Sequence, residues 1–173
     1  MVLLTSSIYR NMTFIGSKDD IDLYENLIKD HIPSNIQEYT YIEPFGGSFG
    51  LRNLFQRQPK KLIYNDIIKY DFEISNLDER LDLDYKEILD RYDSSDSLFY
   101  LDPPYYGKEH FYGMNKNDKK FHTEIRSSIE NRLGLILLSY QDCPFIRELY
   151  EGFEIYQYKG THKYKLKEIL IKI

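Results

Sequence analysis

The sequence predicts an α/β domain built on a mostly parallel β-sheet. Short apolar stretches, typical of buried strands, alternate along the chain with segments of helical periodicity. Several of these predicted strands stop at a carboxylate, a proline or a glycine cluster. A chain of 173 residues with 42% hydrophobic and 29% charged residues has the size and composition of one domain with its own core.

The first half of the chain is predicted to hold one clear helix and two strands. Residues 19–31 begin with two carboxylates and then place apolar side chains at helical spacing. Residues 40–43 form a short strand that leads into a glycine cluster and a helix-like stretch over 51–57. A second strand covers residues 61–64 and stops at Asn65-Asp66.

The second half is predicted to begin with an acidic, mostly helical segment at residues 67–97. The remaining predicted elements are a strand at 97–101, a loop at 107–120, a helix at 121–132, a strand at 134–139, a helix at 145–150 and a terminal hairpin at 154–158 and 168–173. We find no internal repeat and no low-complexity segment.

Charge is unevenly distributed along the chain. The net charge is −5, which argues against a generic nucleic-acid coat protein. Residues 66–102 hold 12 acidic and 4 basic residues, whereas residues 159–173 hold five lysines and one glutamate. A basic face therefore remains compatible with an acidic chain, although each cluster is also compatible with a solvated surface.

Composition excludes several other classes of protein. The single cysteine, Cys143, rules out an internal disulfide and a cysteine-based zinc site, and the four histidines show no metal-ligand spacing, so we expect no metal. No apolar run is long enough for a membrane span and no signal peptide is recognisable, so we expect a cytoplasmic chain with no membrane partner. The 17 tyrosines serve either core filling or stacking on planar ligands.

Three acidic residues stand at the ends of three predicted strands, namely Glu43, Asp66 and Asp102. Ligands of parallel α/β sheets bind at the carboxyl ends of the strands. The three carboxylates are therefore expected to share one site.

Residues 43–50 (EPFGGSFG) form a glycine turn between a strand and a helix-like stretch. Glycines allow a ligand to approach the backbone closely, although tight packing alone also selects them. The segment is not a phosphate loop, because no Gly-Lys-Ser/Thr follows, and it lacks the G-x-G-x-x-G dinucleotide pattern.

Asp102-Pro103-Pro104-Tyr105 follows an apolar strand. Two prolines stiffen the backbone and remove two N–H donors, which leaves a carboxylate, bare carbonyls and an aromatic ring. These groups suit a flat ligand with an exocyclic amine, because the oxygens accept its hydrogen bonds while the ring stacks. The alternative is an ordinary strand-terminating turn.

Together these motifs resemble the Dam-type, or D12-class, N6-adenine DNA methyltransferases, which use S-adenosylmethionine. The similar segments are 13–18 (TFIGSK), 41–47 (YIEPFGG), 64–66 (YND) and 99–106 (FYLDPPYY), with further similarity at 137–150 and 167–171. The resemblance implies a Rossmann-like class I methyltransferase fold, with helices on both faces of the sheet and a C-terminal β-hairpin.

The resemblance also implies residue roles. The catalytic residues would be Asp102, Pro103, Pro104 and Tyr105, with Asp102 and the Pro103 carbonyl holding the target amine and Tyr105 stacking on a flipped base. The cofactor would be held by Gly16, Ser17, Lys18, Glu43, Phe45, Gly46, Gly47, Asp66 and Asp102. Asp66 would accept hydrogen bonds from the ribose hydroxyls.

Two departures from the family pattern bear on DNA recognition. Phe49 occupies the second glycine position of the turn, unless Gly50 takes that position by a one-residue shift. The short acidic segment 67–97 stands in place of a target-recognition domain. Residues 1–173 would then form a single catalytic domain. DNA contacts would come from Lys108, Lys116, Asn117, Lys119 and Lys120, from the 159–167 hairpin, or from a partner protein.

Two alternatives stay open. The acceptor of the methyl group could instead be RNA, cytosine N4 or a protein amide. The chain could also be a non-catalytic subunit of the same fold.

Overall fold

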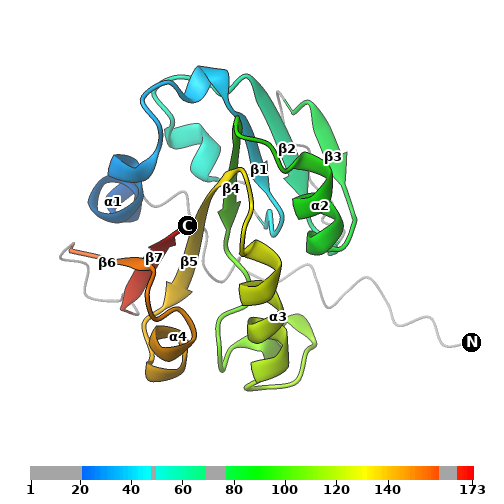
Figure 1. Cartoon of the computed structure of the whole chain (residues 1–173), viewed down its shortest axis with the longest axis vertical. Helices are drawn as coiled ribbons and strands as arrows, with labels where there is room; N and C mark the ends of the chain where they lie inside the picture. The colour runs from blue at the N-terminus through cyan, green and yellow to red at the C-terminus, as the bar shows by residue number, and fades with distance from the viewer. Residues whose placement is uncertain (1–20, 48–49, 69–76, 160–166) are drawn as a thin grey trace, which may run out of the picture.

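The computed structural model describes residues 21–47, 50–68, 77–159 and 167–173, which form one seven-stranded sheet covered by helices (Figure 1). The strands are β1 Thr40–Glu43, β2 Lys61–Asn65, β3 Glu79–Leu81, β4 Ser97–Leu101, β5 Leu135–Gln141, β6 Glu154–Gln157 and β7 Glu168–Lys172. The α-helices are α1 Ile21–Leu23, α2 Tyr85–Tyr92, α3 Lys119–Ile129 and α4 Pro144–Leu149. Shorter 3₁₀ segments cover Lys29–His31, Ile36–Glu38, Leu51–Leu54 and Glu109–Tyr112, and a π-helical turn covers Tyr24–Ile28.

The strand order is β3-β2-β1-β4-β5-β7-β6, and it reverses direction between β1 and β4. β1 pairs in parallel with both β2 and β4, and the pairs β2–β3 and β4–β5 are also parallel. Only β7, among the described strands, runs antiparallel to its neighbours β5 and β6. The predicted mostly parallel sheet with a C-terminal hairpin is therefore confirmed.

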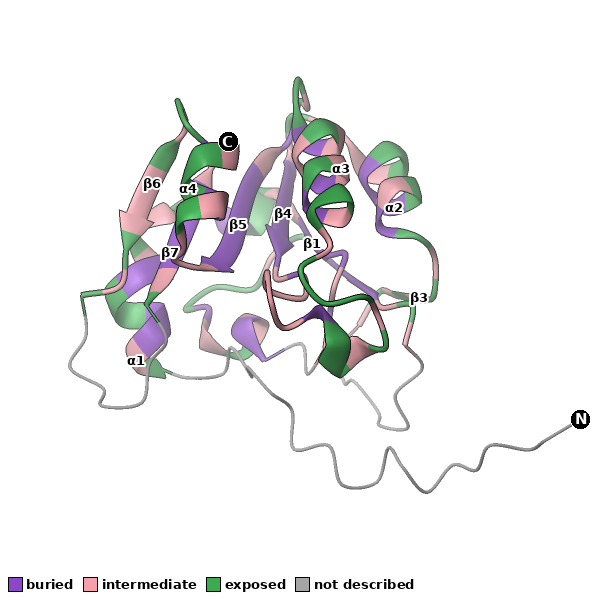
Figure 2. Cartoon of the chain, turned by 90° about the horizontal axis from the view of Figure 1, so that it is seen from below, coloured by how far each residue is buried: buried purple, intermediate pink, exposed green. Residues whose placement is uncertain are grey.

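The central strands divide their side chains between two cores. Every residue of β4 is buried, and the side chains alternate, with Leu98 and Tyr100 on one face and Phe99 and Leu101 on the other. This burial on both faces is the pattern of a parallel strand covered by helices on each side. Figure 2 shows β4 and β5 buried between the layers.

Helices α2, α3 and α4 cover one face and the N-terminal helical segment covers the other. Ile88 of α2, Ile125 of α3 and Ile146 of α4 are fully buried in the first core, whereas Leu27 and Ile28 belong to the second. Helices on both faces are thus confirmed (Figure 2). Within the described residues, no helix combines the length and apolar character that crossing a membrane requires.

The mostly helical prediction for residues 67–97 is wrong for part of this segment. Residues 69–76 lie outside the described part of the chain, and β3 covers Glu79–Leu81 before helix α2 begins. β3 is a three-residue edge strand without a buried side chain, so it lacks the apolar alternation that marks a strand. Its parallel pairing with β2 makes it a strand.

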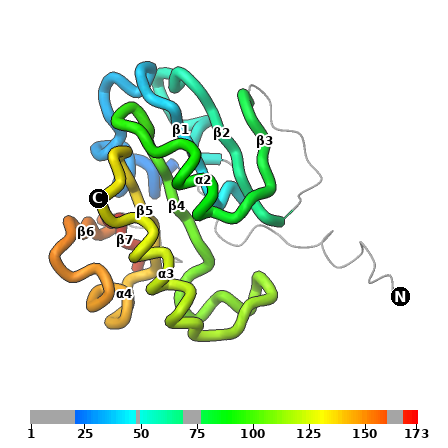
Figure 3. Tube along the Cα trace, turned by 45° about the vertical axis from the view of Figure 1, so that its right-hand side comes forward, coloured from blue at the N-terminus to red at the C-terminus, as the bar shows by residue number. Residues whose placement is uncertain are grey.

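The predicted loop 107–120 also needs correction. It contains the 3₁₀ segment Glu109–Tyr112, and helix α3 begins at Lys119 rather than at Phe121. Asp118 caps this helix, since its carboxylate accepts a hydrogen bond from the backbone N–H of Phe121 at 3.1 Å. The tube in Figure 3 shows the chain leaving β4, passing through this segment and returning as α3.

Asn65 joins the carboxyl ends of β1 and β2 to the segment before α2. Its buried side-chain amide donates to the carbonyl oxygens of Pro44 at 2.9 Å and Leu83 at 3.0 Å, and its side-chain oxygen accepts from the Leu83 N–H at 2.9 Å. Its backbone carbonyl accepts from the Gly46 N–H at 2.8 Å. The glycine turn is therefore fixed against β2.

A substitution at Gly46 tests how closely the glycine turn packs against β2. A Cβ at Gly46 would lie 2.3 Å from Cε2 of Tyr64 and 3.0 Å from the carbonyl oxygen of Asn65, so Gly46→Ala forces the turn away from β2. We expect a loss of about 3 kcal/mol in the free energy of unfolding, measured by urea denaturation.

The matched control is Gly47→Ala. A Cβ at Gly47 meets no atom within 4 Å, and only its positive φ of 47° penalises a side chain. We expect this variant to lose about 1 kcal/mol. Equal losses in the two variants would contradict tight packing at Gly46.

Candidate functional site

The three strand-end carboxylates lie on one face of the sheet. Side chains alternate along a strand, so residues two apart share a face. Glu43, Asp66 and Asp102 each follow by two positions a tyrosine that is buried in the second core; these tyrosines are Tyr41, Tyr64 and Tyr100. Because the order reverses between β1 and β4, Glu43 and Asp102 flank the switch point, where α/β sheets bind their ligands.

Glu43 is the most enclosed of the three carboxylates, with 4% of its surface exposed. The hydroxyl of Tyr41 donates a hydrogen bond to its Oε1 at 2.6 Å. Burial raises the pKa of the Glu43 carboxyl well above its usual range, and the charges of Asp102 and Asp66 raise it further, against the lowering effect of Tyr41 and Arg52. The three carboxylates are therefore close enough to interact.

Asp66 connects the glycine turn to the end of β2. Its Oδ2 accepts from the Gly47 N–H at 2.9 Å, and its Oδ1 accepts from the Ile68 N–H at 2.8 Å. Burial raises the pKa of Asp66, while these two backbone hydrogen bonds lower it. Each carboxylate oxygen has a second lone pair, so a ligand hydroxyl can still donate to this group.

Ile67, which the sequence reasoning missed, is 70% exposed beside Asp66. Its place directly after Asp66, rather than its exposure, makes it available to a ligand bound at that carboxylate. The signal in the sequence was an isoleucine directly after a strand-end carboxylate.

Phe45 occupies a different environment from the carboxylates. Its ring centroid lies 5.1 Å from that of Tyr85 in α2 and 6.5 Å from that of Phe121 in α3. The ring therefore packs with the first core and braces the glycine turn. The backbone of Phe45, Gly46 and Gly47 remains the part of this segment next to Asp66.

The Asp102-Pro103-Pro104-Tyr105 segment leaves the sheet directly after β4. Pro103 is buried, whereas Asp102, Pro104 and Tyr105 are partly exposed. The Tyr105 hydroxyl lies 3.5 Å from the hydroxyl of Ser139. Burial raises the pKa of Tyr105 well above its usual range, and the charges of Asp102 and Glu168 act in the same direction. Asp102 and Tyr105 are therefore neighbours in one site.

The predicted DNA-binding lysines fall into two groups. Lys108 and Lys116 belong to the loop after Tyr105; Lys116 is exposed, and Lys108 Nζ lies 5.9 Å from the ring centroid of the exposed Phe111. Lys119 and Lys120 are exposed at the start of α3. Lys119 Nζ lies 5.2 Å from the ring centroid of Phe145.

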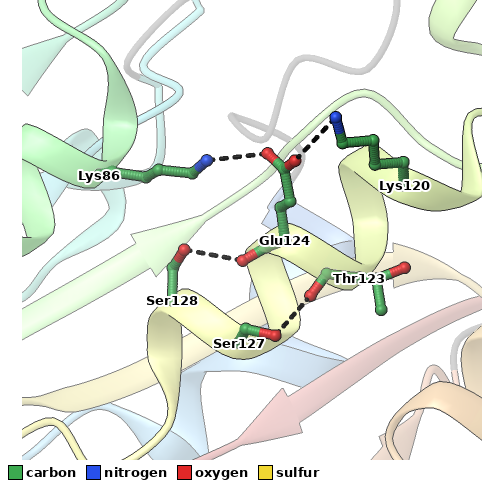
Figure 4. Close-up of a pocket in the computed structure, with 6 residues that line it drawn as sticks. All are labelled: Lys86, Lys120, Thr123, Glu124, Ser127 and Ser128. Carbon is green, nitrogen blue, oxygen red and sulfur yellow. Dashed lines mark hydrogen bonds and ion pairs between the residues drawn. The ribbon is translucent and has the colours of Figure 1, made fainter.

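Lys120 points toward a surface pocket between α2 and α3 (Figure 4). The pocket, of about 520 Å³, is lined by Lys86, Lys120, Thr123, Glu124, Ser127 and Ser128. Glu124 pairs with Lys86 at 2.8 Å and with Lys120 at 3.7 Å. No strand-end carboxylate lines this pocket, so it is separate from the candidate site.

Several predicted site residues lie outside the described residues. These are Gly16, Ser17 and Lys18, together with Phe49 and most of the 159–167 hairpin. Within the described part, no group of three or more His, Cys, Asp or Glu side chains is arranged to hold a metal ion.

The raised pKa of Glu43 has a consequence for stability. Ionising Glu43 is harder in the folded chain than in the unfolded chain, so stability falls as pH rises from the unfolded pKa toward the higher folded pKa. Glu43→Gln keeps an acceptor for Tyr41 and removes this cost. We expect it to raise the free energy of unfolding by about 1–2 kcal/mol at pH 8 and not at pH 4.

Urea denaturation at both pH values measures the effect. Glu25→Gln is the control, because Glu25 is an exposed carboxylate paired with Lys29 at 2.6 Å. It should change stability little at either pH. A Glu43→Gln chain that is less stable than the wild type at pH 8 would contradict the assigned cost.

Comparison with known proteins gives a family match. Residues 14–82 and 67–164 match the family model described as D12 class N6 adenine-specific DNA methyltransferase. Over 86 residues, or 50% of this chain, the sequence is 28% identical to the type II methyltransferase M.CviBI of Paramecium bursaria Chlorella virus NC1A, and the match covers 33% of that relative. The match thus spans about a third of the relative's length.

Two solved structures share the fold. SMU.776, assigned as a methyltransferase and solved with SAH, superposes on this chain with a TM-score of 0.51 at 14% sequence identity. The aligned region covers 82% of this chain and 47% of SMU.776. A protein of Streptococcus mutans assigned to the SAM-dependent methyltransferases gives 0.50 at 14% identity, with 83% and 47% covered. The predicted Rossmann-like methyltransferase fold is confirmed, and, since the family model matches most of its length, this chain belongs to the D12 class N6 adenine-specific DNA methyltransferase family.

Proposed function

We propose that this chain transfers a methyl group from S-adenosylmethionine to the N6 amine of adenine in DNA. The observation that carries the proposal is that Glu43, Asp66 and Asp102 lie on one face at the carboxyl edge of the sheet. Glu43 and Asp102 flank the switch point between β1 and β4 there. Family membership supports the same reaction.

The residues at this edge fit S-adenosylmethionine. Asp66 accepts the ribose hydroxyls with its remaining lone pairs, and the exposed Ile67 contacts the adenine ring attached to that ribose. Gly47 has open space where a Cβ would stand, so the methionine part passes close to the backbone. Gly16, Ser17 and Lys18 hold the methionine carboxylate in this proposal.

Charge supports the same ligand. S-adenosylmethionine carries a positive sulfonium and a positive ammonium, and these are offset by one carboxylate. The carboxylates of Asp66 and Asp102 form a region of negative potential that favours such a cation, whereas the raised pKa of Glu43 favours its neutral form. The glycine turn also lacks the lysine of a phosphate loop.

The reaction requires a nucleophilic amine at Asp102. Bound S-adenosylmethionine supplies an electrophilic methyl group on sulfur. The Asp102 carboxylate and the Pro103 carbonyl accept hydrogen bonds from the two N–H bonds of the adenine amine, which pyramidalises the nitrogen and directs its lone pair at the methyl carbon. The N–CH₃ bond forms as the S–CH₃ bond breaks, and Asp102 or water accepts the released proton. Tyr105 stacks on the flipped base.

DNA binding in this proposal relies on the lysines beside the site. Lys108 and Lys116 belong to the loop after Tyr105, and Lys119 stands at the start of α3. The acidic segment 67–97 contributes no phosphate contacts. We further propose that residues 1–173 act as one catalytic domain and that a partner protein supplies sequence recognition.

Asp102→Asn tests the chemistry. The amide has the shape of the carboxylate without its charge, so we expect the rate of methyl transfer to fall by about 100-fold or more. The assay follows labelled methyl groups into mixed-sequence DNA, and mass spectrometry of the digested DNA separates N6-methyladenine from N4-methylcytosine.

Asp142→Asn is the matched control. Asp142 also follows a parallel strand at this edge, but it forms hydrogen bonds with Arg147 at 2.6 and 3.0 Å. Its variant should keep the wild-type rate. Retained transfer in Asp102→Asn would overturn the catalytic role, and a wild-type chain that binds no S-adenosylmethionine by calorimetry would favour the non-catalytic subunit.

The double variant Lys108→Gln/Lys116→Gln tests the DNA contacts. Each lysine that neutralises a phosphate adds about one to the slope of log affinity against log salt, so the slope should fall by about two. Fluorescence anisotropy of a mixed-sequence duplex measures it. Lys60→Gln is the control, because Lys60 pairs with Asp96 away from the site and should leave the slope unchanged.

A further inference from the structure

Three fully buried polar side chains form a chain of hydrogen bonds beside the catalytic segment. Glu109 and His122 have no exposed surface, and Tyr140 is likewise 0% exposed. Nε2 of His122 lies 2.9 Å from Oε1 of Glu109, and Nδ1 of the same ring lies 2.8 Å from the hydroxyl oxygen of Tyr140. The methyl-transfer chemistry proposed above uses none of these groups.

The protonation states follow from the surroundings. Burial lowers the pKa of His122, against the raising effect of Glu109, so the imidazole is neutral at neutral pH. Burial alone would raise the pKa of Glu109, but hydrogen bonds from His122 and from the backbone N–H groups of Glu109, Gly107 and Asn117 bring it below its usual range. An ionised Glu109 only accepts, so His122 carries its proton on Nε2, and the Tyr140 hydroxyl donates to Nδ1.

This network joins the two ends of the loop that follows Tyr105. Glu109 lies near the start of the loop, and its Oε2 accepts from the backbone N–H of Asn117, near the loop's end, at 3.1 Å. The carbonyl of Glu109 accepts from the Met114 N–H at 3.3 Å. Through His122 in α3 and Tyr140 in β5, one carboxylate ties both ends of the loop to the sheet.

The network also touches the catalytic segment. The ring centroid of Tyr140 lies 6.0 Å from that of Tyr105, and the ring of Tyr106 lies 5.6 Å from His122. The loop that the network holds carries the exposed Lys116, the half-buried Lys108 and the 43% exposed Phe111. The network therefore contacts both this loop and the segment that contains Tyr105.

Stability alone is a poor explanation for this arrangement. Enclosing a carboxylate costs desolvation energy, and apolar side chains of similar volume often stabilise a core equally well. A hydrogen-bonded network instead favours one conformation, because its bonds are directional and a displaced polar group would stay buried without a partner.

We propose that Glu109, His122 and Tyr140 are positioning residues, which hold loop 107–118 in the conformation that receives the nucleic acid. The proposal rests on the proposed function for its substrate. It assigns the network to DNA binding rather than to cofactor binding, since the contacts lead to the loop and not to Asp66.

Two disruptive variants and one conservative variant separate the roles. Tyr140→Phe removes the donor to Nδ1, and Glu109→Ala removes the acceptor for Asn117. In Glu109→Gln the amide oxygen still accepts from Asn117, while the amide nitrogen donates to His122 Nε2. His122 then moves its proton to Nδ1 and donates to the Tyr140 hydroxyl, so both contacts of His122 and the contact to Asn117 are kept.

Hydrogen exchange of the backbone amides in residues 107–117 and duplex anisotropy measure the effects. We expect both disruptive variants to exchange faster and to bind DNA more weakly. Tyr140→Phe should change each quantity by about tenfold, as the loss of one buried hydrogen bond implies, and Glu109→Ala by at least as much, because it removes the contacts to both His122 and Asn117. S-adenosylmethionine affinity should stay within about twofold. Glu109→Gln should behave like the wild type.

Imidazole ¹⁵N NMR tests the assigned proton positions, while the difference between DNA affinity and cofactor affinity separates a positioning role from a merely structural one. His122 should be protonated on Nε2 in the wild type and on Nδ1 in Glu109→Gln. Tyr92→Phe is the control for loss of a phenol, because Tyr92 donates to Glu79 at 2.7 Å away from this loop. It should change neither loop exchange nor DNA affinity.

Two results would overturn the proposal. One is unchanged exchange in the loop of both disruptive variants. The other is a loss of cofactor affinity as large as the loss of DNA affinity, which would assign the network to the domain as a whole. A wild type that transfers no methyl group would overturn the proposed function, and the exchange and NMR results would still decide the positioning role.

Discussion

The hydrogen bond from the Gly47 N–H to the Asp66 carboxylate is the contact on which the candidate site depends. It joins the turn after β1 to the end of β2 at a distance of 2.9 Å. The bond forms because the two strands run in parallel, which brings both carboxyl ends to the same edge. Asn65, one residue earlier, fixes the same turn through Pro44 and Gly46. A ligand at this edge therefore meets a preorganised backbone rather than a mobile loop.

Placing carboxylates together at the strand ends opposes folding. Each carboxylate of the site follows a tyrosine buried beneath it, and Glu43 itself is nearly enclosed next to Asp102. Like charges in a partly desolvated edge oppose folding. The two apolar cores on either face of β4 supply the offsetting stability. Such a conflict between local charge and burial is typical of functional sites.

The two polar systems of this chain differ in kind. Asp66 at the sheet edge is partly exposed, and each of its oxygens has a second lone pair, so it can still accept a hydrogen bond from a ligand. The network of Glu109, His122 and Tyr140 is fully buried, and its side chains are hydrogen-bonded to one another through His122. The first system suits recognition of a cation, and the second suits fixing a conformation. The segment from Asp102 to Tyr105, proposed above as catalytic, contacts both systems, since the charge of Asp102 acts on Glu43 and the ring of Tyr105 lies next to that of Tyr140.

The sequence alone determined the strands at 40–43 and 97–101, the terminal hairpin and the convergence of the three strand-end carboxylates, because strong apolar runs and parallel pairing are local or topological signals. Only the tertiary structure decided that residues 79–81 form a strand. This short polar segment has no apolar alternation, and only its hydrogen-bonded pairing with β2 defines it as a strand. It likewise decided that the Phe45 ring joins the first core and that Glu109 meets His122. Those contacts join residues that are distant in the chain, and no periodicity within one segment encodes them.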